Sequence, residues 1–169
     1  MVNIAGVWPS QEAQILYLRQ IVIAARAQPE IRRLARDIVA RQFGCATNDQ
    51  RRHALALARW VQMNVRYMQE IPEVLQTPAV TIAEGYGDCD DQAVLLCTLL
   101  EAVGIGSYLF AIGGWAPPDR YSHIYCVAEL PGPELIPLDT TLATDIMRQQ
   151  RDPLAEMRAR YGDVNVFVG

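Results

Sequence analysis

The chain has 169 residues, of which 51% are apolar, 20% charged and 8% aromatic, and its formal net charge is −4. This length and composition suit one globular domain with a sizeable core, and they exclude a disordered chain or two full domains. No stretch approaches the roughly 20 apolar residues of a membrane helix, and residues 1–4 lack the features of a signal peptide. We therefore expect residues 1–169 to form a single cytoplasmic domain.

The charges are distributed unevenly along the chain. Residues 1–66 hold 10 Arg and 4 acidic residues, whereas residues 67–169 hold 5 Arg and 15 acidic residues. This asymmetry favours an arginine-rich helical layer packed against an acidic remainder; an arginine face for an external acidic partner is the less favoured alternative. An acidic chain lacks the basic footprint of a nucleic-acid-binding protein, so we expect no nucleic-acid partner.

The N-terminal part of the chain predicts three helices. Apolar residues recur at helical intervals over residues 10–27, and a proline at position 29 both ends this segment and suits the first turn of the next. The second helix is expected over residues 29–43, before a glycine. The third begins near Asn48 or Asp49, either of which can cap a helix.

The middle of the chain contains an irregular segment followed by the strongest helical signal. Residues 67–87 lack periodicity and are interrupted by Pro and Gly, which predicts a long connection with one short helix at 79–84. Residues 89–103 are apolar on nearly every side of a helix. Such a helix must be central and buried.

The C-terminal part predicts a small sheet. Three strands are expected at residues 107–112, 122–130 and 135–138, separated by turns rich in Gly and Pro. Residues 144–160 are expected to be helical with an interruption at Pro153, and residues 164–168 to add an edge strand. Helices followed by strands predict an α+β fold, with the buried helix against a small antiparallel sheet and an N-terminal helical layer.

Four cysteines are present, and one of them differs from the others in its surroundings. They lack the C-x-x-C spacing of a zinc site and are too few for a disulfide scaffold, so we expect reduced thiols. Three lie among apolar or small neighbours, as small buried hydrophobes do: Cys45, Cys97 and Cys126. Cys89 lies instead among acidic residues at a predicted helix start.

The position of Cys89 favours a reactive thiol. Asp88 is placed to cap the helix, three residues before Asp91, and the two can form a capping box. Cys89 is then the first helical residue, where free backbone amides and the helix dipole favour the thiolate. The neighbouring carboxylates raise the pKa of the thiol, so a reactive Cys89 requires a cationic partner nearby.

The acidic residues around Cys89 also permit a second interpretation. Asp88, Asp90 and Asp91 offer the hard oxygen ligands that calcium prefers. However, successive helical residues point in different directions, and the regular spacing of a calcium loop is absent. We therefore assign these residues to helix capping and predict no metal and no cofactor.

Of the two histidines, one is a candidate partner for Cys89. His53 lies beside two arginines in the third helix, and we interpret it as a structural residue. His123 begins an apolar strand, and Asp139 ends another apolar strand 16 residues later. Together with Cys89 these are the residue types of a thiol nucleophile, its base and the carboxylate that orients the base.

With these features the chain resembles the transglutaminase-like superfamily, whose fold is that of the papain-like cysteine proteases. The resemblance covers roughly residues 55–142, between an N-terminal extension over 1–54 and a C-terminal helix and tail over 143–169. It rests on five blocks, at residues 87–96 running into 99–105, at 122–125, at 136–141, at 60–67, and at 75–78 with 85–87.

The resemblance implies roles for individual residues. Cys89 would be the nucleophile, His123 the general base and acid, and Asp139 the residue that fixes the imidazole. The Cys89 amide and one further donor would hold the oxyanion. Papain-like proteases place a Gln six residues before the cysteine, where this chain has Ala83. The remaining candidates for this donor or for substrate contacts are Gln76, Tyr86, Trp115 and Tyr121.

The resemblance also implies the class of reaction. We expect a cysteine peptidase, amidase or deamidase that attacks an amide bond of a protein or peptide and passes through a thioester. Hydrolysis is favoured because a domain of this size leaves little room for a dedicated amine-acceptor site. The alternatives are a true transglutaminase and a catalytically silent binding or assembly module, as in the phage or prophage domains that this chain resembles. No membrane partner is expected, and the oligomeric state is not predicted.

Overall fold

The computed structural model describes residues 8–43, 48–69, 74–113, 121–132, 134–143, 145–148, 151–162 and 164–169. The helices are α1 (Gln11–Ala25), α2 (Pro29–Phe43), α3 (Gln50–Asn64), α4 (Pro78–Glu84), α5 (Cys89–Ala102) and α6 (Pro153–Tyr161). The strands are β1 (Arg66–Tyr67), β2 (Tyr86–Gly87), β3 (Gly106–Gly113), β4 (His123–Leu130), β5 (Glu134–Leu138) and β6 (Asn165–Val168).

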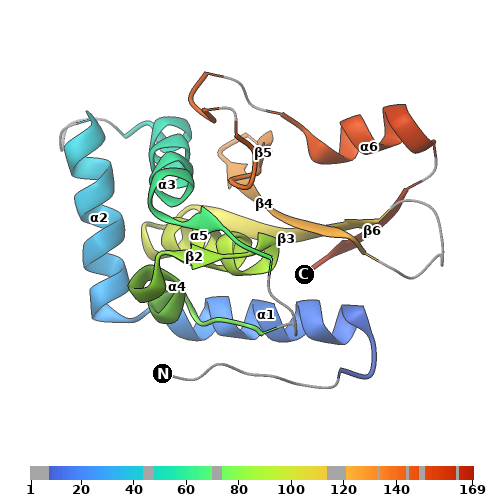
Figure 1. Ribbon diagram of the computed structural model, residues 1–169. Helices are drawn as coiled ribbons and strands as arrows, with labels where there is room; N and C mark the ends of the chain where they lie inside the picture. The colour runs from blue at the N-terminus through green and yellow to red at the C-terminus, as the bar shows by residue number, and fades with distance from the viewer. Residues whose placement is uncertain are drawn as a thin grey trace.

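Helix α5 is the central element of the fold (Figure 1). It packs on β3 and β4 on one side, and α1, α2, α3 and α4 contact its other sides. A helix surrounded in this way must be apolar around its whole circumference, which explains the pattern in the sequence. Every residue of α5 is buried except Cys89 and Glu101, which lie at its two ends. The predicted α+β fold, with a buried helix on an antiparallel sheet, is confirmed.

Four strands form the main sheet, in the order β5-β4-β3-β6, and all neighbours are antiparallel. The register of the central pair places Ile112 opposite His123 and Gly106 opposite Glu129. Strand β6 is the edge strand that the sequence predicts. This register brings the start of β4, with His123, to the same end of the sheet as the end of β5.

A short parallel pairing between β1 and β2 was not predicted. Arg66 pairs with Tyr86, and Tyr67 with Gly87. Strands of two residues carry no readable periodicity, so tertiary contacts alone reveal them. This pairing fixes the chain immediately before Cys89.

Local capping explains most helix boundaries. The side chain of Ser10 accepts from the amide of Ala13 at the start of α1, and Asp49 accepts from Arg52 at the start of α3. Helix α4 begins with Pro78 and ends at a glycine in the left-handed conformation.

The prediction of a helix over residues 144–160 was wrong in its bounds. Residues 146–148 form a turn, and α6 begins only at Pro153. Proline fits the first helical position because it has no amide hydrogen to leave unsatisfied. Asp152 caps this start by accepting from the amides of Leu154 and Ala155. Pro153 therefore begins the helix that it was expected to interrupt.

Ion pairs join the basic and acidic parts of the chain. Arg19 and Arg26 both bind the carboxylate of Glu101. Two arginines of α3 make similar contacts, Arg51 with Glu134 and Arg59 with Asp145. These contacts agree with the predicted arginine-rich layer packed on an acidic remainder. Along the ranges that the structure describes, no helix has the length and hydrophobicity needed to span a bilayer.

Candidate active site

Cys89 is the first residue of α5 and is partly exposed. The predicted capping box is present: the Asp88 carboxylate accepts from the amide of Asp90 at 3.1 Å, and the Asp91 carboxylate accepts from the amide of Asp88 at 3.4 Å. Asp91 also accepts from the amide of Gln76 at 2.8 Å. These bonds hold the chain so that the Cys89 thiol lies at the positive end of the helix dipole.

Gly87 and Gln92 further fix the approach to Cys89. A Cβ atom at Gly87 would lie 2.7 Å from the Cβ of Asp91, so this position has room for glycine alone. The Gln92 amide donates to the carbonyl oxygens of Val65 at 3.5 Å and Gly87 at 3.4 Å. The path of the backbone before the thiol is therefore set by close packing.

His123 and Asp139 form a direct pair. The Nε2 atom of His123 lies 2.7 Å from Oδ2 of Asp139. The other Asp139 oxygen accepts from the amide of Thr141 at 3.0 Å and from its hydroxyl at 2.7 Å. This contact holds the imidazole at Nε2, so Nδ1 is the ring nitrogen that is not bonded to Asp139.

The environment of Asp139 determines its protonation. Burial alone raises the pKa of this carboxyl, but the hydrogen bond and charge of His123 and the two bonds from Thr141 outweigh burial, so the pKa is lowered from its ordinary value. Asp139 is therefore a carboxylate at neutral pH. As a carboxylate it stabilises a protonated imidazole.

A cleft of about 390 Å³ contains both Cys89 and His123. Its lining comes from four segments: Gln11, Gln14 and Ile15 of α1; Tyr67 and Gln69 at β1; Asp88, Cys89 and Asp90 at α5; and Tyr121, Ser122, His123 and Ile124 at β4. The structure thus brings the predicted nucleophile and base to one cavity, although 34 residues separate them.

Two polar contacts that the sequence did not predict support this site. Gln11 donates from Nε2 to the carbonyl of Tyr121 at 3.1 Å and accepts from its amide at 2.7 Å. Thr140 donates to Oε1 of Gln92 at 2.9 Å and so joins the end of β5 to α5. Gln11 and Tyr121 are 110 positions apart, so no local pattern could have indicated their contact.

The aromatic ring of Tyr125 lies beside the imidazole. The ring centroids of His123 and Tyr125 are 6.0 Å apart, and the planes are inclined by 16°. Tyr125 is buried, and burial raises the pKa of its phenol above the ordinary value. It is therefore neutral at physiological pH, and its ring packs against His123 as an uncharged group.

The remaining candidates have different placements. Tyr121 lines the cleft, and its ring lies 6.2 Å from that of Phe167. Gln76 is buried and Tyr86 belongs to β2; neither is among the residues that line the cleft. Trp115 lies outside the described residues. His53, interpreted as structural, lines a separate cleft.

The three carboxylates near Cys89 lie close together. Asp88, Asp90 and Asp91 each place one oxygen within 4.8 Å of the others, and all three residues are buried. The carboxylates of Asp88 and Asp91 take part in the capping box, as predicted. Their negative charge opposes ionisation of the neighbouring thiol, which makes the imidazole of His123 important to any reactivity.

The other described cysteines are buried in the core. The Sγ atoms of Cys97 and Cys126 are 3.2 Å apart, and burial and this contact raise the pKa of Cys126 well above its ordinary value. The Cys126 thiol therefore remains neutral, and both thiols are inaccessible to solvent. Cys45 lies outside the described residues.

Comparisons with known proteins agree with this fold. The family model of the transglutaminase-like superfamily matches residues 36–129, more than half of the chain. The match includes Cys89 and His123 and ends before Asp139. No curated protein matches the chain.

Two solved structures share the fold. One is a "putative protease" from Parabacteroides distasonis, with a TM-score of 0.60 and 14% identity; the match covers 82% of this chain and 28% of that one. The other is a "putative cysteine protease" from Cytophaga hutchinsonii, with a TM-score of 0.53 and 20% identity, over 83% of this chain and 50% of that one. The chain thus spans half or less of the length of these two proteins, and the likeness shows a common fold.

Proposed function

The chain belongs to the transglutaminase-like superfamily, and from that premise we propose that it is a thiol-dependent enzyme that hydrolyses an amide bond of a protein or peptide. The observation that carries the proposal is the position of Cys89 and His123 in one cleft, with His123 bonded to the buried Asp139 at 2.7 Å. Both the residue types and their arrangement suit nucleophilic catalysis by a thiol.

The proposed reaction begins with proton transfer from the Cys89 thiol to Nδ1 of His123. The thiolate attacks the carbonyl carbon of the substrate amide, and the carbonyl oxygen becomes an oxyanion beside the amides at the start of α5. Collapse of this intermediate breaks the C–N bond, and His123 returns its proton to the leaving nitrogen. The product is a thioester on Cys89.

Water completes the proposed cycle. His123 accepts a proton from a water molecule, which attacks the thioester carbonyl. The C–S bond then breaks, the carboxylic acid product leaves, and His123 returns the proton to the Cys89 sulfur. A leaving group that is an amine of a peptide makes the reaction peptidolysis, and ammonia from a glutamine side chain makes it deamidation. Attack by an amine in place of water would make the enzyme a transglutaminase.

The first test measures alkylation of Cys89 by iodoacetamide between about pH 5 and 8, with the labelled cysteine identified by peptide mass spectrometry. A thiolate paired with His123 should react well below the free-thiol pKa of about 8.5, and His123→Ala should remove this reactivity. Cys97 and Cys126 serve as internal controls because both are fully buried. Cys89 labelling that follows an ordinary thiol in both proteins would indicate a catalytically silent module.

The second test separates the possible reactions. A mixed peptide library containing glutamine is incubated with the protein, with Cys89→Ala and with an added primary amine. New peptide termini indicate peptidolysis, released ammonia indicates deamidation, and incorporated amine indicates a transglutaminase. All signals should disappear in Cys89→Ala, and a signal that persists in that variant contradicts the assigned nucleophile.

A further inference from the structure

The arginines of α2 differ from those of α1 and α3. Arginines of α1 and α3 bind carboxylates of the acidic part of the chain. Helix α2 carries four exposed arginines: Arg32, Arg33, Arg36 and Arg41. Within the described ranges none of these four guanidinium groups has an ion pair or a side-chain hydrogen bond. The predicted attraction between the two parts of the chain therefore does not account for them.

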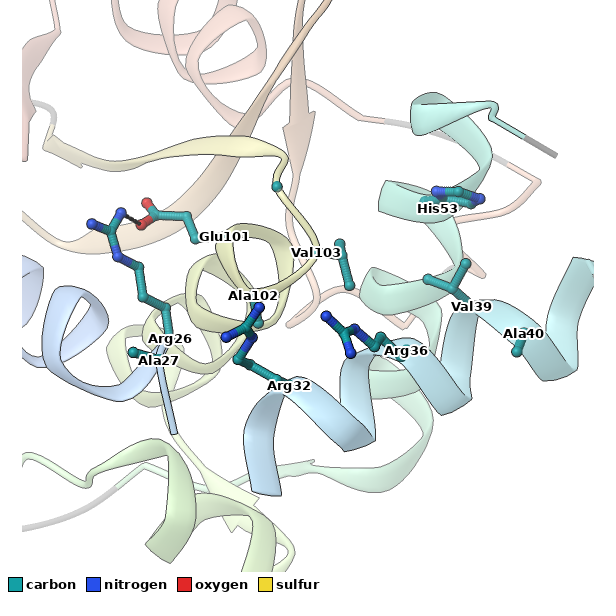
Figure 2. Close-up of a pocket in the computed structure, with 11 residues that line it drawn as sticks. Arg26, Ala27, Arg32, Arg36, Val39, Ala40, His53, Glu101, Ala102 and Val103 are labelled. Carbon is teal, nitrogen blue, oxygen red and sulfur yellow. Dashed lines mark hydrogen bonds and ion pairs between the residues drawn. The ribbon is translucent and has the colours of Figure 1, made fainter. Parts of the chain in front are cut away.

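Two of these arginines face a cleft of about 750 Å³, which is larger than the cleft at Cys89. Figure 2 shows Arg32 and Arg36 projecting from α2 toward the end of α5, with His53 of α3 on the same cleft. Arg26 also lines it and binds Glu101 at 2.7 Å. We term this cavity the arginine cleft.

The charge of the arginine cleft is positive. Glu101 is the acidic residue in its lining, and its carboxylate already binds both Arg19 and Arg26. Arg32 and Arg36 are four positions apart on one helix, where like charges repel each other. An anion between the two guanidinium groups would relieve this repulsion.

The arginines also lie near the C-terminal end of α5, where the helix dipole is negative. A purely structural role would bond them to the last carbonyls of α5 or to Glu101. The carbonyls of Leu100 and Glu101 instead accept from the backbone amides of Val103, Gly104 and Ile105. These last carbonyls of α5 therefore do not occupy the guanidinium N–H groups of Arg32 and Arg36.

The rest of the lining is apolar. It consists of Ala27, Val39, Ala40, Ala102, Val103 and Gly104. The volume falls within the range of about 300–1,000 Å³ that small-molecule sites occupy. A cavity with two guanidinium forks and an apolar wall suits a ligand with an anionic group joined to an organic body.

We propose that the arginine cleft binds a small organic phosphate with at least two phosphate charges. Arg32 and Arg36 hold successive phosphate oxygens, and the organic body rests against Val39 and Val103. Arginine is suited to this role because its planar fork matches the oxygens of phosphate. The site is separate from Cys89, which lies at the opposite end of the 14-residue helix α5.

The test is isothermal titration of the full chain with ADP, inorganic pyrophosphate and adenosine. We expect saturable binding of ADP to one site, weaker binding of pyrophosphate and none of adenosine. Arg32→Gln/Arg36→Gln should weaken ADP binding at least about tenfold. The control variant Arg33→Gln/Arg41→Gln removes the same charge from the same helix, outside the arginine cleft. It should change the affinity for ADP less than about threefold.

Several outcomes would overturn the proposal. No saturable binding of ADP would exclude the site, and equal weakening by the two double variants would show diffuse attraction to a charged helix. Pyrophosphate that binds more tightly than ADP would contradict a role for the apolar wall. Thermal unfolding of both variants provides the control for folding, and Cys89 labelling, which should be unchanged in both, separates this site from the proposed catalytic one.

Discussion

Asp139 is the residue whose environment makes the sharpest prediction. Its carboxylate joins His123 to Thr141 in a buried position, and these bonds lower its pKa. A carboxyl group whose pKa is lower in the folded state stabilises the protein at every pH above the pKa that the group has in the unfolded chain, about 3.9. This stabilisation is lost as the pH falls through the pKa of the folded state. The contribution is therefore complete at neutral pH and disappears in acid.

Asp139→Asn should reduce activity by about 10²-fold or more, because the amide neither stabilises the imidazolium nor fixes its tautomer as the carboxylate does. Urea unfolding from about pH 7 down to pH 3 should show a smaller loss of stability in the variant than in the parent protein. Asp37→Asn alters an exposed carboxylate of α2 outside the lining of the Cys89 cleft, so it should preserve both activity and the pH slope. Parallel pH profiles for Asp139→Asn and the parent protein would contradict the assigned role.

Helix α1 lies outside the family match and yet forms one wall of the cleft. Its Gln11 makes two hydrogen bonds to the backbone of Tyr121, two residues before His123. Helix α1 therefore holds the backbone just before β4, the strand that begins with His123. Its neighbour Gln14 lines the same cleft without such a contact among the described hydrogen bonds.

Gln11→Ala should lower the free energy of unfolding by about 1–3 kcal/mol, since two hydrogen bonds of about 0.5–1.5 kcal/mol each are lost. Cys89 alkylation at low pH should slow several-fold, because the segment leading to His123 is less well held. Gln14→Ala is the matched control and should leave both quantities nearly unchanged. The measurements are urea unfolding and the alkylation rate, and similar losses in the two variants would show that α1 does not position His123.

At the scale of elements, prediction succeeded wherever a signal was local. The bounds of α1, α2, α5 and the main strands, and the start of α3, lie within three residues of the predicted positions because caps, prolines and periodicity mark them. The pairing of β1 with β2 and the start of α6 at Pro153 were missed. The β1–β2 pairing depends on a contact between distant segments. The start of α6 was missed because proline favours the first position of a helix but breaks a helix in its interior.

The whole molecule is held together in part by the attraction between its basic and acidic portions. Glu101 is the clearest example: its side chain is 5% exposed and binds Arg19 and Arg26, which are 23% and 46% exposed. Ion pairs with exposed partners are screened by salt, so they contribute less than fully buried ones.

Glu101→Gln should lower the free energy of unfolding by about 1–2 kcal/mol, since the charge of a carboxylate that is only 5% exposed and has two arginine partners is lost, but both arginines remain solvated. Raising NaCl from about 0.02 to 0.5 M should destabilise the parent protein more than the variant. Glu129→Gln removes a charge that contacts the Tyr108 hydroxyl and no arginine among the described contacts, so it should retain the parental salt dependence. Equal salt dependence in parent and Glu101→Gln would contradict the role of these pairs.

The sequence by itself determined the α+β class, the central buried helix and the three residue types proposed for catalysis. These features follow from periodicity, capping and the spacing of a few polar residues, all of which are local. Tertiary structure alone placed Cys89 and His123 in one cleft, bonded Gln11 to Tyr121, left Gln76 and Tyr86 out of the cleft lining, and grouped Arg32, Arg36 and His53 at the other end of α5. The physical reason is that such contacts join residues far apart in the chain, and their geometry is fixed only when the helices and the sheet pack together.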